Sequence, residues 1–374
     1  MFENKIKSLF AKADIRINGS RPWDIMVNDN RFYSSLVWKG MTGMGDAYVK
    51  GWWDCKRLDV MVTMALKANI NLAARFNVIN YLYFLKAKLF NLQKPSRAFI
   101  VGKEHYDIGN DLYELMLDKR MVYTCGYWKN ARNLDEAQEA KLHLVCKKIG
   151  LKKGQRVLDI GCGWGGFAQF AAKEYGAKVV GITVSKEQAA LAKIRCRGLP
   201  VEIRLQDYRD VNEKFDHVIS LGMFEHVGYK NYKDYMEVVH RCLKDEGLFL
   251  LHTMGQRDSY PNTKQPECHW VIKNIFPNGM LPSVSQIGKS VEGLFVIEDW
   301  HTFGADYDKT MMAWFKNFDN NWHRIKDKYG NDFYRMWKYF LMIFIGAWRS
   351  RNQYNLWQTV FSKNGVPGGY KSVR

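Results

Sequence analysis

The chain has 374 residues, of which 47% are hydrophobic and 25% charged, as in a folded protein with a sizeable core. Its length suggests about two or three domains, and its composition excludes disordered, collagen-like and coiled-coil proteins. The longest apolar run, Tyr339–Trp348, has about ten residues, whereas a membrane-spanning helix needs about 20. Residues 1–15 contain no continuous apolar signal region. We therefore expect a cytoplasmic protein that does not cross a membrane.

The charge is strongly positive. Lysine and arginine (56) outnumber aspartate and glutamate (38), which gives a net charge of +18. Such an excess favours a polyanionic partner, either nucleic acid or the anionic face of a membrane. No acidic residue occurs between Asp59 and Glu104, and residues 71–95 mix basic and apolar side chains at helical spacing. This pattern predicts an amphipathic helix on an anionic bilayer, or a solvated linker helix that packs against a neighbouring domain.

The cysteines give no sign of a metal site. The sequence contains seven, and no pair has the spacing of a zinc ligand set. A cytosolic protein also seldom keeps disulfides, so we expect neither a structural metal nor a disulfide.

Residues 1–70 are expected to form a small, mainly helical domain. Turn signals occur at Asn18-Gly19, Gly40, Gly43, Gly45 and Gly51. The glycine-rich segment 40–55 lacks the Lys-Ser/Thr ending of a phosphate-binding loop and follows no buried strand. We therefore expect a packing turn, with Trp52 and Trp53 anchored in the core.

From about residue 96 the pattern changes to short apolar runs separated by helical segments. Strands are expected at residues 155–163, 177–185, 201–207, 215–223, 248–255 and 295–304, and helices at 165–176, 186–198 and 309–360. Continuous apolar strands that alternate with helices predict an α/β domain, in which a parallel sheet carries helices on both faces.

The strongest local signal is a glycine-rich turn after the first of these strands. Its residues are Asp159, Gly161, Cys162, Gly163, Trp164 and Gly165. A dinucleotide site would have an acidic residue at the tip of the next strand, where this chain has Thr183. That difference counts against a nicotinamide cofactor. The pattern instead resembles the S-adenosylmethionine pocket of class I methyltransferases, and the alternative is a glycine turn without a ligand.

Polar clusters stand where several strands end, at residues 222–228, 251–255 and 303–307, and a fourth cluster at 123–128 precedes the sheet. Ligands of open α/β sheets bind beyond the carboxyl ends of the strands. We therefore expect Cys125, Glu225, His252 and Tyr307 to converge on one cavity. Each one taken alone could equally be a buried polar residue with a structural role.

These motifs together resemble one family over essentially the whole chain. The segments YTCGYW, VLDIGCGWGG, GITVSKEQ, GMFEHVG, LLHTMG, NIFPNG and DWHTFGADYD are similar to those of the cyclopropane-fatty-acyl-phospholipid synthases, relatives of the mycolic-acid methyltransferases. The resemblance implies a class I (Rossmann-like) S-adenosylmethionine-dependent methyltransferase domain with helical insertions at residues 96–374, which includes acyl-chain-binding helices. It also implies that residues 1–70 associate with lipid and that 71–95 form the linker helix.

The resemblance further implies a reaction. The family transfers a methyl group from S-adenosylmethionine to a cis double bond of a membrane phospholipid, and the resulting carbocation loses a proton and closes a ring. A bound bicarbonate accepts that proton. Its implied ligands are Glu225, His252, Tyr307, Cys125 largely through its backbone, and the backbone of Met254. The implied cofactor contacts are Tyr123, Thr124, Gly161, Gly163, Thr183, Gln188, Asp207 and Tyr208. A homodimer at the inner face of the cytoplasmic membrane is implied as well.

Two positions depart from the family pattern, and three other functions stay open. Phe344 stands where many relatives have a cysteine, and Met254 where isoleucine is common. A related enzyme could give a methyl-branched or methylene product from the same cation. The positive charge would also fit an RNA methyltransferase, but this chain lacks the Pro-Pro or Pro-Cys motif of that class. We therefore expect no nucleic-acid partner. A membrane-bound protein with an inactive methyltransferase fold is the third alternative.

Overall fold

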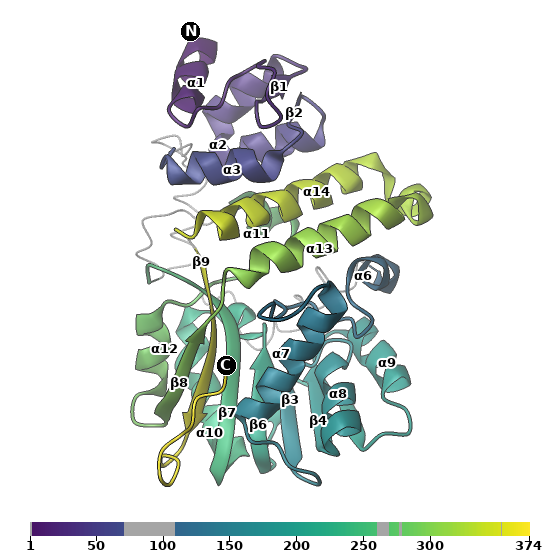
Figure 1. The fold of residues 1–374 in the computed structure, drawn as a ribbon, viewed down its shortest axis with the longest axis vertical. Helices are drawn as coiled ribbons and strands as arrows, with labels where there is room; N and C mark the ends of the chain where they lie inside the picture. The colour runs from purple at the N-terminus through teal and green to yellow at the C-terminus, as the bar shows by residue number, and fades with distance from the viewer. Residues whose placement is uncertain (1, 71–108, 260–268, 277–278, 353) are drawn as a thin grey trace. The chain divides into compact units, whose positions relative to one another are not determined.

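The computed structural model describes residues 2–70, 109–259, 269–276, 279–352 and 354–374 (Figure 1). The described chain divides into two compact units. A helical unit comprises the described parts of Met1–Phe90, Thr263–Pro277 and Tyr307–Tyr354. A sheet unit comprises those of Asn91–Asn262, Asn278–Asp306 and Asn355–Arg374. The basic segment 71–95, expected to be a linker helix, lies outside the described residues.

The sheet unit is built on seven strands in the order β5-β4-β3-β6-β7-β9-β8. Their bounds are β3 Arg156–Ile160, β4 Lys178–Thr183, β5 Val201–Leu205, β6 Phe215–Leu221, β7 Leu243–Gln256, β8 Val296–Thr302 and β9 Tyr354–Ser362. Strands β3 to β7 pair in parallel, and β8 pairs antiparallel with β9. The expected parallel sheet is thus confirmed for five strands, and an antiparallel pair extends it to a mixed sheet.

Helices cover both faces of this sheet, because the side chains of each strand alternate between two hydrophobic clusters. Leu158 and Ile160 face a cluster with α10 (Tyr232–Cys242) and α12 (Val284–Val291). Val157 faces the other cluster, with α7 (Leu134–Lys148), α8 (Gly166–Tyr175) and α9 (Lys186–Arg195). The short helix α6 (Asn110–Met116) precedes them. The three-layer arrangement is the class I methyltransferase fold predicted from the sequence.

Strand β9 corrects one expectation. The aromatic-rich stretch 309–360 was expected to be helical throughout, yet the helix α14 (Lys326–Ser350) ends at Arg351, which has a positive φ of 62°. The following residues form β9, which lies between β7 and β8. Pairing with strands distant in sequence, which no local pattern reports, determines the conformation of this segment.

The helical unit contains residues from both ends of the chain. Its elements are α1 Phe2–Ala11, β1 Met26–Val27, α2 Arg31–Val49, β2 Trp53–Asp54, α3 Leu58–Lys67, α11 His269–Asn274, α13 Asp306–Asn321 and α14. Within it Arg349 of α14 pairs with Asp59 of α3 at 2.6 Å and with Asp308 of α13 at 2.9 Å. This grouping differs from the expected boundaries, which placed 1–70 in a domain of their own. No helix of the described ranges is both long and apolar enough to cross a bilayer.

The glycine-rich segment of residues 40–55 is mostly helix, and the expected turn is confined to residues 50–51, where Gly51 has a positive φ of 72°. Gly40, with φ 55° and ψ −134°, kinks α2, whereas Gly43 and Gly45 lie within the helix. A Cβ at Gly45 would lie 2.6 Å from the ring of Trp270, so the glycine permits close packing of α11. Trp53 is buried as expected. Trp52 is only half-buried, and it is not anchored in the core as expected; the charged groups of Arg31 and Lys50 lie over its ring.

A glycine at the crossing of α3 and α14 provides a test of this packing. A Cβ on Gly346 would lie 2.7 Å from the carbonyl oxygen of Asp59 and from Cβ of Val62. We expect Gly346→Ala to destabilise the protein by about 1–3 kcal/mol through overpacking. Gly288 in α12 has open space around its Cα, so Gly288→Ala should be neutral or stabilising. Thermal unfolding of both variants checks this, and equal shifts would contradict the packing.

Candidate functional site

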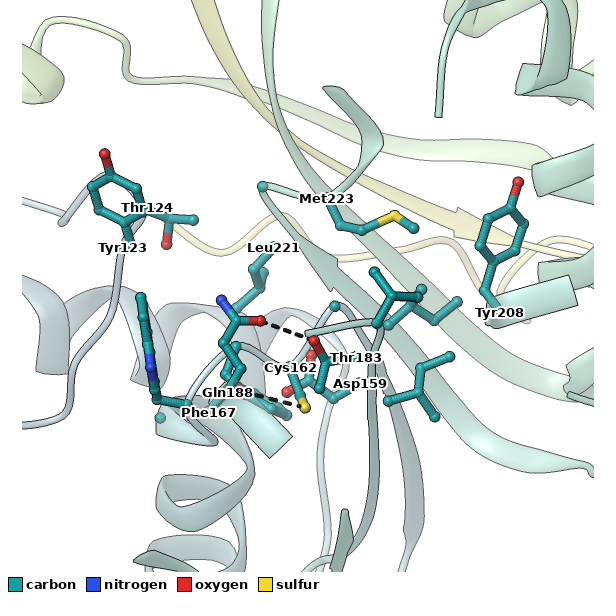
Figure 2. Close-up of a pocket in the computed structure, with 18 of the residues that line it drawn as sticks. Tyr123, Thr124, Asp159, Cys162, Phe167, Thr183, Gln188, Tyr208, Leu221 and Met223 are labelled. Atoms are coloured by element: carbon teal, nitrogen blue, oxygen red, sulfur yellow. Dashed lines mark hydrogen bonds between the residues drawn. The ribbon is translucent and has the colours of Figure 1, made fainter. Parts of the chain in front are cut away.

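A pocket lies in the sheet unit where β3, β4 and β6 end (Figure 2). It is lined by all but one of the residues predicted to contact the cofactor: Tyr123, Thr124, Asp159, Gly161, Cys162, Gly163, Trp164, Thr183, Gln188, Asp207 and Tyr208. The exception, Gly165, begins α8 and lies behind the loop, where a Cβ would meet Sγ of Cys196 at 3.1 Å. The structure therefore brings together residues from separate segments at the edge where open α/β sheets bind ligands.

The glycine turn leaves β3 tightly because Gly161 has a positive φ of 81°. A Cβ there would also lie 2.7 Å from Cβ of Met223. The amides of Gly161 and Cys162 both donate to the carbonyl of Ile182 on the neighbouring strand β4. Trp164 is anchored by a hydrogen bond from its Nε1 to Oδ1 of Asn110 at 2.8 Å. Glycine is required at position 161 both by the backbone conformation and by the space available.

Asp159 is the acidic group of the pocket. It is buried in the middle of the sheet, and its Oδ2 has no hydrogen-bond partner among the described residues. Burial raises the pKa of this carboxyl to about 7, while the charge of Lys141 lowers it. An unpartnered carboxylate oxygen in a water-poor pocket fits a ligand that brings a positive charge or a hydrogen-bond donor. S-adenosylmethionine, with its ammonium and hydroxyl groups, meets this condition.

Thr183 and Gln188 form a polar pair at the end of β4. The hydroxyl of Thr183 donates to Oε1 of Gln188 at 2.8 Å, and both side chains are buried. Ser185, between them, caps α9 by accepting the amide N–H of Gln188. The pair replaces the acidic residue of a dinucleotide site, and it leaves the amide nitrogen of Gln188 to donate to a ligand.

Tyr208 stands at the far end of the pocket from Tyr123 and Thr124 (Figure 2), and Asp207 precedes it in the lining. The carboxylate of Asp207 accepts the amide N–H of Arg209 and pairs with its guanidinium at 2.9 Å. That guanidinium lies 4.7 Å from the centre of the Tyr208 ring. Tyr208 is buried, and its hydroxyl has no partner in the described part of the chain. The ring thus offers a fixed aromatic face to a planar ligand.

Glu225 and Met254 are joined by a hydrogen bond. The amide N–H of Met254 donates to Oε1 of Glu225 at 2.6 Å, so this predicted backbone ligand already has an acceptor. Oε2 of Glu225 has no partner among the residues described. Burial raises the pKa of the Glu225 carboxyl to about 7, and the hydrogen bond from Met254 counteracts the shift. The group can therefore change protonation state near neutral pH.

His252 lies on β7 opposite Leu221, the last residue of β6. Gln358 Nε2 lies 3.3 Å from His252 Nδ1 and donates to it, which makes Nε2 the protonated ring nitrogen. Nε2 has no partner in the described ranges. Burial lowers the pKa of this imidazole far below its ordinary value, and the nearby cations Lys141 and Lys148 lower it further. His252 is thus a neutral ring with one N–H donor to offer.

The remaining predicted residues stand in two different places. Cys125 is buried in the sheet unit, and its thiol donates to the carbonyl of Gly126 at 3.2 Å. Tyr307 belongs to the helical unit, where its ring packs against Trp348 with 4.8 Å between centroids. That Tyr307 joins Glu225 and His252 stays a prediction. Phe344, also in the helical unit, stacks on Tyr354 at 5.7 Å.

Several pocket residues were not predicted from the sequence. Met223, His226 and Arg209 line the pocket. In the sequence, Met223 precedes Glu225 by two residues, His226 follows Glu225, and Arg209 follows Tyr208. Burial lowers the pKa of His226 to about 4, which keeps this ring neutral as well. All three lie within two residues of a predicted site residue in the sequence. This closeness within a motif was the available signal that they belong to the pocket.

The sheet order β5-β4-β3-β6-β7-β9-β8 with an antiparallel β8–β9 pair, helices on both faces and a glycine turn after β3 together form the fold of a class I S-adenosylmethionine-dependent methyltransferase. Comparisons with known proteins specify the family. The model of the mycolic acid cyclopropane synthetase family matches residues 93–359. The chain belongs to this family.

Individual relatives agree with that assignment. The chain is 51% identical over 366 residues to a cyclopropane-fatty-acyl-phospholipid synthase of Escherichia coli strain K12, which covers 98% of this chain and 94% of that protein. It is 38% identical over 248 residues to a probable fatty acid methyltransferase of Pseudomonas putida, covering 63% of this chain and 62% of the relative.

Solved structures show the same fold. The cyclopropane synthase MmaA2 of Mycobacterium tuberculosis matches with a TM-score of 0.66 and 26% identity, covering 71% of this chain and 98% of the other. The mycolic acid cyclopropane synthase CmaA1, solved with SAH and CTAB, matches with a TM-score of 0.65 and 28% identity over the same shares.

The raised pKa of Glu225 predicts a pH effect on stability. Glutamate in an unfolded chain titrates near pH 4.3, so folding takes up a proton at this site between about pH 4.5 and 7. This contribution makes the free energy of unfolding fall as the pH rises through that window. Glu225→Gln removes it and keeps an oxygen for the Met254 amide. The variant should gain on the order of 2 kcal/mol relative to the unaltered protein between about pH 5 and 7.5.

Thermal unfolding of both proteins across this pH range provides the measurement. The difference between their Tm values should change steadily with pH, in favour of the variant at the higher end. Parallel profiles would contradict the assignment of a raised pKa to Glu225.

Proposed function

We propose that this protein transfers a methylene group from S-adenosylmethionine to the cis double bond of unsaturated phospholipid acyl chains, which forms a cyclopropane ring. One observation carries the proposal: next to the pocket, Glu225 Oε2 and His252 Nε2 are buried polar atoms without partners among the described residues. The similarity to the Escherichia coli synthase over 98% of the chain supports the same activity.

The pocket residues account for cofactor binding. S-adenosylmethionine, when bound, supplies the electrophilic methyl group of the reaction. Tyr208 offers an aromatic face for its adenine, Gln188 an amide donor, and Asp159 an acceptor for its ammonium group. These groups are held by hydrogen bonds or by the sheet, so little ordering is needed when the cofactor enters.

Glu225 and His252 account for the proton acceptor. Bicarbonate, when bound, supplies a base of low nucleophilicity toward carbon. The N–H at Nε2 of His252 can donate to one of its oxygens, and Oε2 of Glu225 can accept from its hydroxyl. One donor and one acceptor match the two kinds of oxygen in such an anion, and their hydrogen bonds would determine which oxygen is left to take up a proton.

The surroundings of His252 are aromatic. The ring of Phe303 lies 5.7 Å from that of His252, and the ring of Tyr127 lies 5.4 Å from Phe303. Aromatic faces stabilise a carbocation without attacking it, whereas a nearby unprotonated amine would be alkylated. An alkene is a weak nucleophile, so its alignment in a water-free site provides most of the acceleration.

The substrate places the protein at a membrane surface. The net charge of +18 supports peripheral binding to an anionic bilayer at the inner face of the cytoplasmic membrane, with residues 1–70 as the domain that associates with lipid and 71–95 as the basic linker helix. A homodimer is part of the same proposal, by similarity to the family.

A methyl-branched or methylene product is the second candidate. The Pseudomonas putida relative is named as a fatty acid methyltransferase, and fungal relatives at 34–36% identity are sphingolipid C9-methyltransferases. The same cation gives a ring when the added methyl group loses a proton and the ring closes, and a methyl-branched alkene when a neighbouring carbon of the acyl chain loses the proton. An exocyclic methylene forms when a hydride shift to the cationic carbon precedes loss of a proton from the added methyl group.

Product analysis tests the proposal directly. Purified protein is incubated with S-adenosylmethionine and vesicles of unsaturated phosphatidylglycerol or phosphatidylcholine, and the acyl chains are examined by mass spectrometry and NMR. We expect one added carbon, loss of the alkene and high-field ring protons, with faster conversion of the anionic vesicles. An added carbon with an alkene or a branched methyl would replace the synthase proposal by the second candidate. Cofactor binding without any lipid product would overturn both, and RNA would be the next acceptor to test.

The role of Glu225 predicts a separation of binding from turnover. Because Glu225 holds the proton acceptor and does not line the cofactor pocket, Glu225→Gln should slow product formation by about 100-fold or more. The dissociation constant of S-adenosylhomocysteine should stay within about twofold. Glu246→Gln, an exposed change on the same strand as His252, serves as the control with normal turnover. Equal losses of binding and turnover in Glu225→Gln would contradict the assigned role.

A further inference from the structure

Lys141 is a buried cation that the proposed chemistry does not use. It lies on α7 and has no exposed surface. Its Nζ donates to Oγ1 of Thr124 at 2.9 Å, the one hydrogen bond that this ammonium makes within the described ranges. Ion pairs within 4.0 Å are likewise absent for Lys141 among those residues. A lysine that stays buried with only a neutral hydroxyl for a partner costs stability, so a compensating role is expected.

The backbone around Thr124 does not depend on Lys141. Gln138, one turn earlier on α7, donates from Nε2 to the carbonyls of Val122 and Thr124, at 3.3 and 2.7 Å. The amide of Tyr127 donates to the carbonyl of Ala137 at 2.9 Å. Three hydrogen bonds therefore fix residues 122–127 to α7, and Lys141 adds only its contact with the Thr124 side chain.

That contact determines how the hydroxyl of Thr124 can act. The methyl group of Thr124 packs against Gly222, where a Cβ would lie 2.6 Å from Cγ2. Its Oγ1 accepts the hydrogen bond from Lys141, so the O–H is directed away from the ammonium and is able to donate to another group. None of the described residues accepts it, and Thr124 lines the pocket. The hydroxyl is thus a donor available to a pocket ligand.

The charge of Lys141 acts in the same direction. The charged or titratable groups around it are Asp118, Cys125, Asp159 and His252. The first three raise the pKa of Lys141, and the charge of Lys141 lowers the pKa of Asp118, Asp159 and His252. Burial lowers the pKa of Lys141 to about 8, so the ammonium form still predominates at neutral pH. A positive charge behind a hydroxyl donor, in a region of low polarity, favours an anionic oxygen in front of it.

The position of Thr124 indicates which part of the cofactor this oxygen belongs to. Thr124 and Tyr208 stand at opposite ends of the pocket, with Thr183 and Asp159 between them (Figure 2). When the adenine stacks on Tyr208, the amino-acid end of the cofactor reaches Thr124. That end carries a carboxylate.

We propose that Lys141 is a positioning residue for the cofactor, which orients the hydroxyl of Thr124 toward the carboxylate of S-adenosylmethionine and places a positive charge behind it. The proposal rests on the proposed use of this pocket for S-adenosylmethionine. Lys141 does not contact the cofactor itself and acts through Thr124.

Two ligands distinguish this role from a structural one. S-adenosylhomocysteine carries the carboxylate, whereas methylthioadenosine lacks the whole amino-acid end. Lys141→Met should weaken binding of S-adenosylhomocysteine by about 10- to 100-fold, the range for a hydrogen bond to a charged group. Binding of methylthioadenosine should stay within about twofold. Thr124→Val should give the same pattern, and the double variant should be no weaker than either single one, because both changes remove one interaction.

Isothermal titration calorimetry on the full chain provides these constants, and Lys148→Met is the matched control. Lys148 is a second buried lysine of α7, but it pairs with Asp299 at 3.4 Å and does not line the pocket, so the ratio of the two affinities should not change. If Lys141→Met does not fold, Thr124→Val tests the hydroxyl by itself. Equal losses for both ligands in Thr124→Val, or no loss for S-adenosylhomocysteine, would overturn the proposal. Failure of the unaltered protein to bind either ligand would overturn the proposed function instead.

Discussion

Exclusion of water from the carboxyl ends of β3, β6 and β7 is the constraint on which the site depends. Asp159, Glu225 and His252 sit there almost without exposed surface, and each keeps one polar atom without a partner among the described residues. Burial raises the pKa of both carboxyls to about 7 and lowers that of the imidazole. The same burial that costs stability therefore brings the pKa of the two carboxyls close to neutral pH and keeps the histidine uncharged. A ligand that supplies the missing partners regains part of that cost.

Local sequence signals were sufficient for the part of the fold that forms the pocket. The turn after β3 needs glycine at position 161. Over residues 155–255 the sequence pattern correctly predicts the alternation of apolar strands with helices. By contrast, β9 was expected to be helix because its aromatic residues resemble those of α14, and its pairing with β7 and β8 determines its conformation. Gly45 of α2 was interpreted as a turn signal because its role, to admit the ring of Trp270 from α11, depends on a contact distant in sequence.

The candidate site shows the same division between local and distant information. Eleven of the twelve residues predicted to contact the cofactor line the pocket, whereas Lys141 was overlooked because lysine is usually a surface residue. A signal was present: Lys141 follows Ala137 by four residues and precedes Val145 by four, so it falls on the buried stripe of α7. A lysine at such a position indicates either an ion pair or a functional charge, and the sequence alone does not distinguish the two.

The two buried lysines of α7 show what does distinguish them. Lys148 pairs with Asp299, whose other partners include the guanidinium of Arg374 near the end of the chain, and Tyr370 donates to the Lys148 carbonyl. Its charge is neutralised inside a local network. Lys141 has the same lowered pKa of about 8 and the same burial, yet its hydrogen-bonding partner is a neutral hydroxyl. Burial and pKa are alike, so the two lysines differ in the distance to a carboxylate. Lys148 has one within ion-pair distance, whereas Asp118 and Asp159 act on Lys141 from farther away, and the hydrogen bond of Lys141 goes to a hydroxyl at the pocket.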